Sequence, residues 1–435
     1  MIFNFIHMQL IKEILSQQGL AQTQGRILKK RDLGKICFLE LSDFTGSMQV
    51  VVEKPELLVK LQDLHPQSII SLSGQVHTSP QGKTEIHAES LEIITAVHEV
   101  PDLELQSKQI KENLDTQLKH RAIGLRHKHN KAIFKIQAKI LEAYREFMIQ
   151  LGCTEIFTPL LLASSSEGGA EIFHVDYFEK QATLAQSAQL YKQIMVGAFD
   201  RVFGLSKCFR AELSNTRRHT TEATQLEFEF GYIQGLETIL EHEEAAVRHM
   251  LKKVYSDCQA EMQTLQAPEL MVPKKSFPSY SFEQACKVLT EKFNIDTTDW
   301  DDLSTEAEKI LCQYARDTYQ SDFIFITHIP KGAFYAYRDE KAVIHNVDLL
   351  CKEMEISSGG RRMDDYDQLR MSIMAAGMDP KDFSEYLSIF KFGMPPHGGF
   401  GMGLERLTML ISNQDNIRQT TLFPSDPQRV ASQQI

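Results

Sequence analysis

Alternating apolar and polar residues predict a series of short strands in the first part of the chain. Between residues 23 and 95, turn signals rich in Asp, Gly, Ser and Pro separate the strand-like runs. A helical stretch is expected near residues 55–64. The strand-like runs begin at Gly25, Ile36, Met48, Ile69 and Thr84. About five short strands with one helix predict a small closed β-barrel.

The second part of the chain mixes helical and strand-like periodicity. Apolar residues from about 127 to 150 follow helical spacing, and Gly152 ends that pattern. Further helices are expected at residues 237–261 and 304–319. Strands are expected at residues 182–185, 201–205, 225–230, 323–327 and 343–350. Because helices and strands do not alternate regularly, the pattern favours an α+β domain with an antiparallel sheet.

These patterns predict two domains joined by a connector. Residues 1–100 are expected to form a barrel of the oligonucleotide/oligosaccharide-binding (OB) type, and another small β-barrel or an SH3-like module is the alternative. Residues 101–125 are polar, contain Pro101 and lack strand alternation, which favours a hinge. Residues 126–435 are expected to form the α+β domain.

Composition places the chain among soluble globular proteins. Of its 435 residues, 42 % are hydrophobic and 24 % charged, which excludes a disordered or collagen-like chain. No apolar run reaches the length of about eighteen residues that a membrane helix needs, and the short apolar start disfavours a secretory signal. The seven cysteines form no Cys-x-x-Cys pair, so a reducing, cytoplasmic compartment is expected instead of a disulfide framework or zinc site.

The net charge bears on possible partners. With 47 Lys and Arg against 58 Asp and Glu, it is −11, which taken alone argues against a nucleic-acid partner. Net charge describes the whole chain, however, whereas a few well-placed cations and aromatic side chains are enough to hold a nucleic acid. The motifs therefore decide the question.

A charged hairpin is the first candidate for chemistry. A strand ending at Arg210 leads into a polar loop that contains Arg218 and His219, and the next strand carries Glu227 and Glu229 at alternate positions. Guanidinium groups pair bidentately with phosphate oxygens, while carboxylates hold the cations in place or bind a metal. The pattern indicates a clamp for a polyanion, and a solvated charged hairpin is the alternative.

Two glycine-containing segments are further candidates. Residues 399–406 contain alternating glycines and lead into an amphipathic helix, which places Arg406 beside backbone that can approach a ligand closely. Their spacing is not that of a Walker or dinucleotide-binding loop. In residues 353–362, oxygens of Glu355 and Ser358 would suit Mg²⁺ together with nucleotide phosphates. An ordinary strand running into a glycine turn is the alternative there.

Two shorter segments could contact a small substrate. Residues 165–171 predict a loop that could close over such a substrate, or a plain connecting loop. Lys192, in the segment Gln-Leu-Tyr-Lys-Gln, could lie buried at the base of a pocket and pair with a carboxylate. An exposed helix lysine is the usual alternative.

In combination, these motifs resemble those of the class II aminoacyl-tRNA synthetases, and most closely the aspartyl-tRNA synthetases of archaeal or archaeal-like bacterial type. Phe209-Arg-Ala-Glu, with the Arg-His and Glu that follow, resembles motif 2. Gly399-Phe-Gly-Met-Gly-Leu-Glu-Arg406 resembles motif 3, and the helix ending at Phe157-Thr-Pro159 resembles motif 1. The three motifs stand in the family's order behind a barrel and a hinge, so the resemblance covers nearly the whole chain.

The resemblance implies an ATP- and Mg²⁺-dependent ligase without a covalent enzyme nucleophile. In this family the amino acid's carboxylate attacks the α-phosphorus of ATP, and the resulting adenylate passes its aminoacyl group to the terminal ribose of tRNA. Arg210 and Arg406 are the implied catalytic residues. The residues implied in ATP binding are Arg210 at the α-phosphate, Arg218 and His219 at the γ-phosphate, Glu212 near the base, Gly403 and Arg406 in motif 3, and Glu355 with Ser358 at Mg²⁺.

The resemblance also implies an amino-acid pocket. Lys192 resembles the lysine that pairs with the aspartate side chain, and Arg362 resembles an arginine that helps bind the same group. Asparaginyl enzymes lack that lysine, because a cation matches a neutral amide poorly. The other residues implied in aspartate binding are Gln189, Arg210, Glu227, Ser358 and Glu167, the last in a closing loop with Gly168 and Gly169.

Two positions depart from the family pattern. Aspartyl enzymes more often carry Asp where this chain has Glu227, and Glu there resembles the asparaginyl pattern. Many members carry an aromatic residue that stacks on adenine where this chain has Ala223. An asparaginyl-tRNA synthetase is therefore the main alternative. A tRNA-independent paralogue that makes asparagine and a non-catalytic nucleic-acid-binding regulator are the others.

The N-terminal barrel resembles the anticodon-binding domain. Phe38 matches the stacking aromatic, and Gln49 and Glu85 match residues that contact base edges. For Phe38 an ordinary core aromatic is the alternative. Residues 26–35 hold five basic and one acidic side chain, a local charge of +4, so phosphate contacts are expected there.

Together these features predict an aspartate–tRNA ligase that charges the aspartate tRNA. Charging of the asparagine tRNA is left open. The chain is expected to act as a homodimer, because motif 1 forms the dimer interface in this family, and to have no membrane partner.

Overall fold

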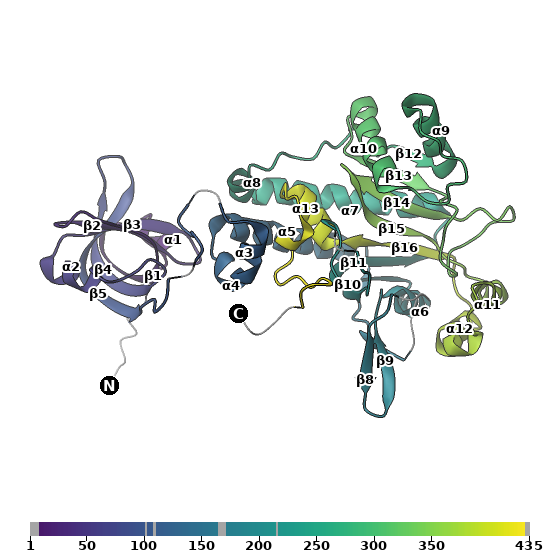
Figure 1. Cartoon of the computed structure of the whole chain (residues 1–435), viewed down its shortest axis with the longest axis horizontal. Coiled ribbons are helices and arrows are strands. Elements are labelled where there is room, and N and C mark those ends of the chain that lie inside the picture. The colour runs from purple at the N-terminus through teal and green to yellow at the C-terminus, as the bar shows by residue number, and fades with distance from the viewer. Residues whose placement is uncertain (1–7, 101, 108–109, 164–170, 215, 431–435) are drawn as a thin grey trace. The chain divides into compact units, whose positions relative to one another are not determined.

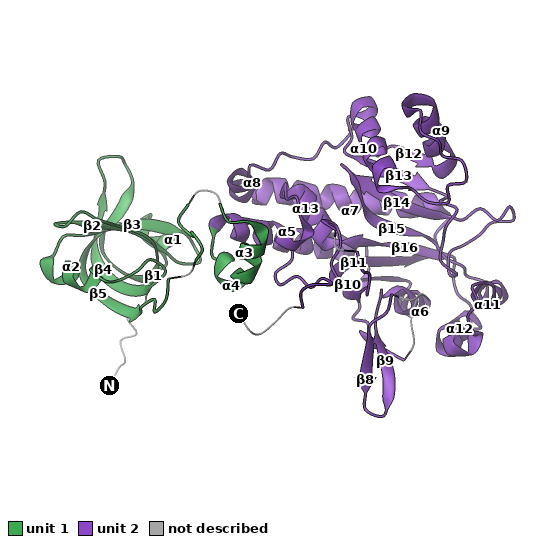
Figure 2. Cartoon of the chain, viewed as in Figure 1, with its two compact units in different colours: residues 1–127 green, residues 128–435 purple. Residues whose placement is uncertain are grey.

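The computed structural model describes residues 8–100, 102–107, 110–163, 171–214 and 216–430. It divides into two compact units, residues 1–127 and 128–435, which Figure 2 distinguishes by colour and which are described separately. None of the described helices has the length and apolar character needed to cross a membrane.

Unit 1 contains a closed five-stranded barrel with strand order β1-β2-β3-β5-β4, in which β1 also pairs with β4 (Figure 1). This closure confirms the predicted OB barrel. Leucine, isoleucine and valine side chains fill it, with Ile11 and Ile14 of a short helix against one end. Its elements are α1 (Ile11–Ile14), β1 (Gly19–Asp32), β2 (Cys37–Ser42), β3 (Ser47–Val52), α2 (Pro55–Leu61), β4 (Ile69–Thr78) and β5 (Thr84–Thr95).

Two parts of unit 1 differ from the pattern-based expectation. Strand β1 begins at Gly19, six residues before the predicted start at Gly25. The sequence pattern does not show this early start because the inward-facing Thr23 is polar. Its hydroxyl is satisfied inside the barrel by donating to the Gln9 carbonyl at 2.8 Å. The stretch expected to be a hinge contains two short helices, α3 (Leu114–Lys119) and α4 (Arg121–Gly124). The side chain of Asn113 caps α3, an N-cap signal that the long polar run obscures.

Unit 2 is built on an eight-stranded sheet of order β12-β13-β14-β15-β16-β11-β10-β6. All neighbouring strands are antiparallel except β12 with β13 and β6 with β10, which confirms the α+β prediction. A smaller sheet has the order β7-β9-β8. The strands are β6 (Thr154–Glu155), β7 (Leu161–Leu162), β8 (His174–Tyr177), β9 (Lys180–Leu184), β10 (Arg201–Phe209), β11 (Glu222–Gly231), β12 (Ser279–Ser281), β13 (Phe323–Thr327), β14 (Asn346–Cys351), β15 (Met354–Arg361) and β16 (His397–Gly403).

The helices of unit 2 lie on both faces of the large sheet (Figure 1). Helices α5 and α7 cover one face, where Phe228 and Phe400 join their core. On the other face α6 contacts β10, β11 and β16, and α10 contacts β13, β14 and β15. The helices are α5 (Lys128–Gln150), α6 (Gln189–Phe199), α7 (Leu236–Asp257), α8 (Gln259–Leu265), α9 (Phe282–Phe293), α10 (Thr305–Tyr319), α11 (Tyr366–Ala375), α12 (Ser384–Phe390) and α13 (Leu404–Ile411), with 3₁₀ turns at Pro380–Phe383 and Ile417–Gln419.

Side-chain alternation along β11 and β16 places apolar residues on one face of the sheet and the candidate site residues on the other. Because successive strand residues point to opposite sides, Phe228 and Phe400 face α5 and α7, while Glu227, Glu229 and the glycines of β16 face the side of α6. The helix before motif 1's Phe157-Thr-Pro159 segment ends at Gln150, as the helical spacing and Gly152 predicted, because Gly152 turns the chain with a φ of +76°. The segment Phe157-Thr-Pro159 therefore lies beyond the helix and is not its end.

Candidate functional site

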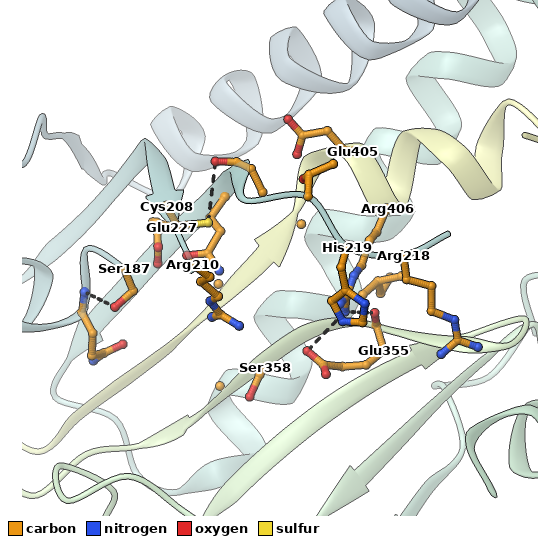
Figure 3. Close-up of a pocket in the computed structure, with 18 of the residues that line it drawn as sticks. Ser187, Cys208, Arg210, Arg218, His219, Glu227, Glu355, Ser358, Glu405 and Arg406 are labelled. Carbon is orange, nitrogen blue, oxygen red and sulfur yellow. Dashed lines mark hydrogen bonds and ion pairs between the residues drawn. The ribbon is translucent and has the colours of Figure 1, made fainter. Parts of the chain in front are cut away.

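A cavity of about 320 Å³ opens on the face of the large sheet between α6 and α13 (Figure 3). Strands β10, β11, β15 and β16 and the loop after β10 also contribute to its wall. Every described residue that was predicted to bind ATP, Mg²⁺ or the amino acid lines it: Gln189, Lys192, Arg210, Glu212, Arg218, His219, Glu227, Glu355, Ser358, Arg362, Gly403 and Arg406. Glu167, with Gly168 and Gly169, lies outside the described residues. Which ligand each lining residue contacts stays a prediction.

At one end of the cavity the buried side chains of Lys192, Arg362 and Glu227 line the wall, and the buried carboxylate of Glu229, which does not itself line the cavity, contacts both cations. Lys192 Nζ lies 2.8 Å from Glu227 Oε2 and 3.2 Å from Glu229 Oε2, and it also donates to the Phe400 carbonyl at 3.1 Å. Arg362 Nε donates to Glu229 Oε1 at 3.0 Å. Lys192 is thus a buried lysine paired with carboxylates, not an exposed helix lysine.

Glu229 bridges the two cations, one carboxylate oxygen towards each. Burial alone would raise its pKa, but the charges of Arg362 and Lys192 hold it below the ordinary value for Glu. Burial likewise opposes the charge of Arg362, yet Glu229 raises the pKa of that guanidinium. The four side chains therefore form a charge-balanced group of two cations and two anions.

The alternating glycines of motif 3 lie in strand β16, not in a loop. Gly401 stands opposite Glu227 and Gly399 opposite Glu229 in the β11–β16 ladder. A Cβ on Gly401 would come within 3.2 Å of Glu227 Oε2, and one on Gly399 within 2.6 Å of Glu229 Oε2. Gly399 thus makes room for the Phe228 carbonyl oxygen and the Glu229 carboxylate, and Gly401 makes room for the Glu227 carboxylate.

The other end of the cavity carries the cations expected at the phosphates. Arg218 lies 2.8 Å from Glu308 Oε2 and donates to the Glu353 carbonyl at 2.6 Å. Arg406 donates to the Glu355 carbonyl at 2.7 Å. Burial, with Arg406 and two further arginines nearby, lowers the pKa of His219, which favours its neutral form. Figure 3 shows Arg218, His219 and Arg406 grouped around Glu355.

A β-bulge brings the two proposed Mg²⁺ ligands to one face. Ile356 is the extra residue, because Leu349 pairs with Ser357 and Leu350 with Glu355. Without it, Glu355 and Ser358 would point to opposite sides of the strand. With it, both line the cavity.

Asp348 is an acidic residue near this site that the sequence reasoning missed. It stands opposite Ser358 in the β14–β15 ladder. Burial and the charge of Glu355 raise its pKa well above the ordinary value for Asp. An aspartate inside the otherwise apolar run 347–351 is the signal that could have found it.

The donor set fits a hard cation completed by substrate oxygens. Mg²⁺ is usually held by one or two carboxylates plus phosphates, and a cation would relieve the repulsion between Asp348 and Glu355. Among the described residues no group of three His, Cys, Asp or Glu side chains has the geometry of a complete metal site. Phosphate oxygens of ATP, with water, would supply the remaining ligands.

In unit 1, a groove on the barrel gathers the residues predicted to read the anticodon. Phe38, Gln49 and Glu85 line it together with Lys29 and Arg31. Phe38 is half-buried and lies outside the apolar core of the barrel, so it is not an ordinary core aromatic. Gln49 Nε2 donates to Glu85 Oε2 at 2.6 Å, which fixes the orientation of both side chains.

The basic stretch 26–35 is only partly available for phosphate contacts. Lys30 donates to the Leu61, Gln62 and Leu64 carbonyls at the end of α2, where a cation favourably meets the helix dipole. Arg26 donates to the Gln67 carbonyl at 2.7 Å. Lys29 also lies 3.5 Å from Glu40 Oε2, so three of the five cations have partners within the barrel, and the expected phosphate surface is smaller than the local charge of +4 indicated.

Comparisons with known proteins agree with this combination of barrel, sheet and cavity. Residues 113–427 match the family described as tRNA synthetases class II (D, K and N), and residues 21–94 match the OB-fold nucleic acid binding domain. The chain therefore belongs to the class II tRNA synthetases of the D, K and N group.

Within this family the chain is similar to aspartate and asparagine enzymes. It is 38 % identical to the aspartate–tRNA(Asp/Asn) ligase of Thermus thermophilus, over 97 % of this chain and 99 % of that one. It is 36 % identical to the aspartate–tRNA(Asp) ligase of Pyrococcus horikoshii, over 93 % and 94 % of the two chains. The asparaginyl-tRNA synthetase structure from Pyrococcus horikoshii with asparaginyl-adenylate superposes with a TM-score of 0.90, at 32 % identity over 98 % of this chain and 100 % of that one.

Proposed function

We propose that this chain is an aspartate–tRNA ligase, which activates L-aspartate with ATP and transfers the aspartyl group to the 3′ end of tRNA. The observation that carries the proposal is the buried pair of cations, Lys192 and Arg362, in the same cavity as Arg210. Two cations in the wall suit a side-chain carboxylate, and Arg210 suits the phosphate that the substrate's α-carboxylate attacks. The names of the relatives at 36–38 % identity support the same substrate.

The reaction would depend on positioning and charge neutralisation. Arg210 would hold the α-phosphate and the attacking carboxylate together, and Arg218, His219 and Arg406 would face the rest of the triphosphate. Preorganised cations act strongly where negative charge builds up in a site that excludes water. Mg²⁺ held by Glu355 and Ser358 would supply further charge neutralisation at the phosphates.

Asparagine is the second candidate substrate, and one observation favours it. Lys192 and Arg362 are already matched by Glu227 and Glu229, so a neutral side chain would not leave unpaired cations. Pyrophosphate exchange with each amino acid separately decides between them. Exchange that depends on asparagine and not on aspartate would contradict the proposal.

The tRNA substrate includes the aspartate tRNA, and the proposal leaves room for the asparagine tRNA, as in relatives named for both. Charging of the two purified tRNAs in parallel with labelled aspartate separates these cases. Aspartate on both tRNAs would identify a non-discriminating enzyme, whereas aspartate on one would identify a discriminating one.

Replacing Phe38 tests the role of the barrel. We expect Phe38→Ala to raise the KM for tRNA about tenfold or more, because stacking on an unpaired base is worth about 1–3 kcal/mol. Pyrophosphate exchange without tRNA should be unchanged. Phe44→Ala is the matched control, since Phe44 is 85 % exposed in the same barrel and does not line the groove. An equal change in both variants, or a change in exchange alone, would contradict the anticodon role.

The raised pKa of Asp348 predicts pH-dependent use of Mg²⁺. Because burial and Glu355 raise this pKa, Asp348 retains a proton at pH values where an ordinary aspartate is ionised, and that proton competes with the cation. The Mg²⁺ concentration for half-maximal exchange should therefore rise as the pH falls into the range where Asp348 takes up its proton. Asp348→Asn should weaken this dependence, and Asp367→Asn, at an exposed position, should leave it unchanged. A dependence that Asp348→Asn does not alter would exclude this carboxyl as its source.

We also propose a homodimer located in the cytoplasm. The segment that resembles motif 1 exposes large apolar side chains, with Phe157 82 % and Ile149 61 % exposed, and patches of this kind commonly mark protein interfaces. Sedimentation equilibrium tests the dimer. The seven free cysteines fit a reducing compartment.

A further inference from the structure

Glu308 lies outside the three motifs but contacts one of their central residues. It is in the first turn of α10, and its carboxylate reaches the guanidinium of Arg218 at 2.8 Å, with both side chains only 15 % exposed. Glu308 does not itself line the cavity, whereas Arg218 does. The carboxylate therefore stands behind the arginine.

A second contact fixes the same guanidinium from another direction. Arg218 Nη1 donates to Glu308, and Nη2 donates to the carbonyl of Glu353 in the turn between β14 and β15. The chain around Arg218 forms no helix or strand in the described residues. These two contacts thus hold Arg218, a loop residue, against helix α10 and against the turn between β14 and β15.

Helix α10 is a rigid support for this contact. Ser304 caps its first turn by accepting from the Ala307 amide at 3.2 Å. Ala307, Leu311 and Cys312 are buried in a core shared with β13 and β14. Glu308 is the next residue after Ala307, so its carboxylate is held in a fixed place relative to β15, the strand that carries Glu355.

We infer that Glu308 is a positioning residue that holds Arg218 ready for the terminal phosphates of ATP, so that α10 is part of the nucleotide site. An arginine side chain carries about 2 kcal/mol of rotamer entropy. Contacts that order Arg218 before ATP binds reduce the entropy cost that ATP binding must offset. The guanidinium has five N–H donors, so donors remain for phosphate oxygens after the two contacts. This inference rests on the proposed function only in that the cavity takes ATP.

The test compares Glu308→Gln with a neighbouring control. We expect Glu308→Gln to raise the Kd for a non-hydrolysable ATP analogue with Mg²⁺ about tenfold, because a charge-assisted hydrogen bond is replaced by a weaker one to a neutral amide oxygen. The KM for aspartate should change less than about twofold, because the amino-acid end keeps its contacts. Glu306→Gln should leave both values unchanged, since Glu306 is an exposed residue of the same helix whose nearest cation, Lys309, is 3.8 Å away.

A double-mutant cycle separates positioning from a general effect on stability. If Glu308 acts through Arg218, Glu308→Gln should add nothing to the loss already caused by Arg218→Gln. Additive losses would overturn the inference. Tighter binding of the analogue by Glu308→Gln would also overturn it, because Glu308 would then compete with phosphate for Arg218. Calorimetry needs no amino acid, so these outcomes are independent of whether aspartate or asparagine is activated.

Discussion

Lys192→Met should abolish aspartate-dependent pyrophosphate exchange, with a loss of at least about 10²-fold. Removing one partner of a buried ion pair costs about 3–5 kcal/mol, and here the lost ammonium would leave Glu227 and Glu229 facing the side-chain carboxylate of aspartate. Binding of the ATP analogue should remain nearly normal. Exchange with titrated aspartate and calorimetry with the analogue measure the two effects.

A paired variant distinguishes lost recognition from lost folding. Lys192→Met/Glu227→Gln removes one cation and one anion, so it should recover much of the lost thermal stability without recovering exchange. Lys207→Met is the surface control, because the Lys207 side chain is 43 % exposed and its ammonium pairs with Glu222 on the same sheet. Near-normal aspartate turnover in Lys192→Met would refute the role assigned to this lysine.

Arg210→Gln should lower the rate of adenylate formation by about 10²–10³-fold, the usual cost of removing one donor that stabilises transition-state charge. Arg210 lines the middle of the cavity, and its side chain is 45 % exposed, 3.8 Å from Glu212. Because the charge at the α-phosphate grows during the reaction, kcat should fall more than the affinity for ATP. Single-turnover formation of adenylate measures the chemical step directly.

The same loop supplies the control for this variant. Arg217→Gln removes an exposed guanidinium that does not line the cavity, and it should leave adenylate formation unchanged. If the two variants lost activity equally, the charge of the loop as a whole, and not the position of Arg210, would be responsible.

The local pattern was sufficient to predict an element where its apolar residues are continuous or form a clear stripe. Strand β13 matches its predicted range, 323–327, because both faces are covered and every residue is buried. Helix α10 also lies where it was predicted, because Ser304 caps its start and its apolar residues form one buried stripe. The convergence of the motif residues on one cavity could be predicted, because their order along the chain and the family resemblance implied a common site.

Pattern failed where polar residues are buried or where geometry depends on a neighbouring strand. Thr23 concealed the start of β1, because its hydroxyl is satisfied inside the barrel. Asp348 and Glu308 escaped attention, since their importance comes from the β14–β15 ladder and from Arg218, both distant in sequence. The basic stretch 26–35 was over-interpreted, because Lys30 and Arg26 bind carbonyls.

The pairing of Glu227 with Gly401 and of Glu229 with Gly399 constrains how this enzyme's selectivity could change over evolution. Each glutamate occupies space that the opposite strand provides by lacking a side chain. Shortening Glu227 would leave a void, and a side chain at position 401 that filled this void would crowd the original glutamate if it were restored. If these glutamates set the amino-acid preference as proposed, substitutions on the two strands are coupled, and the first substitution affects which second substitutions natural selection can accept.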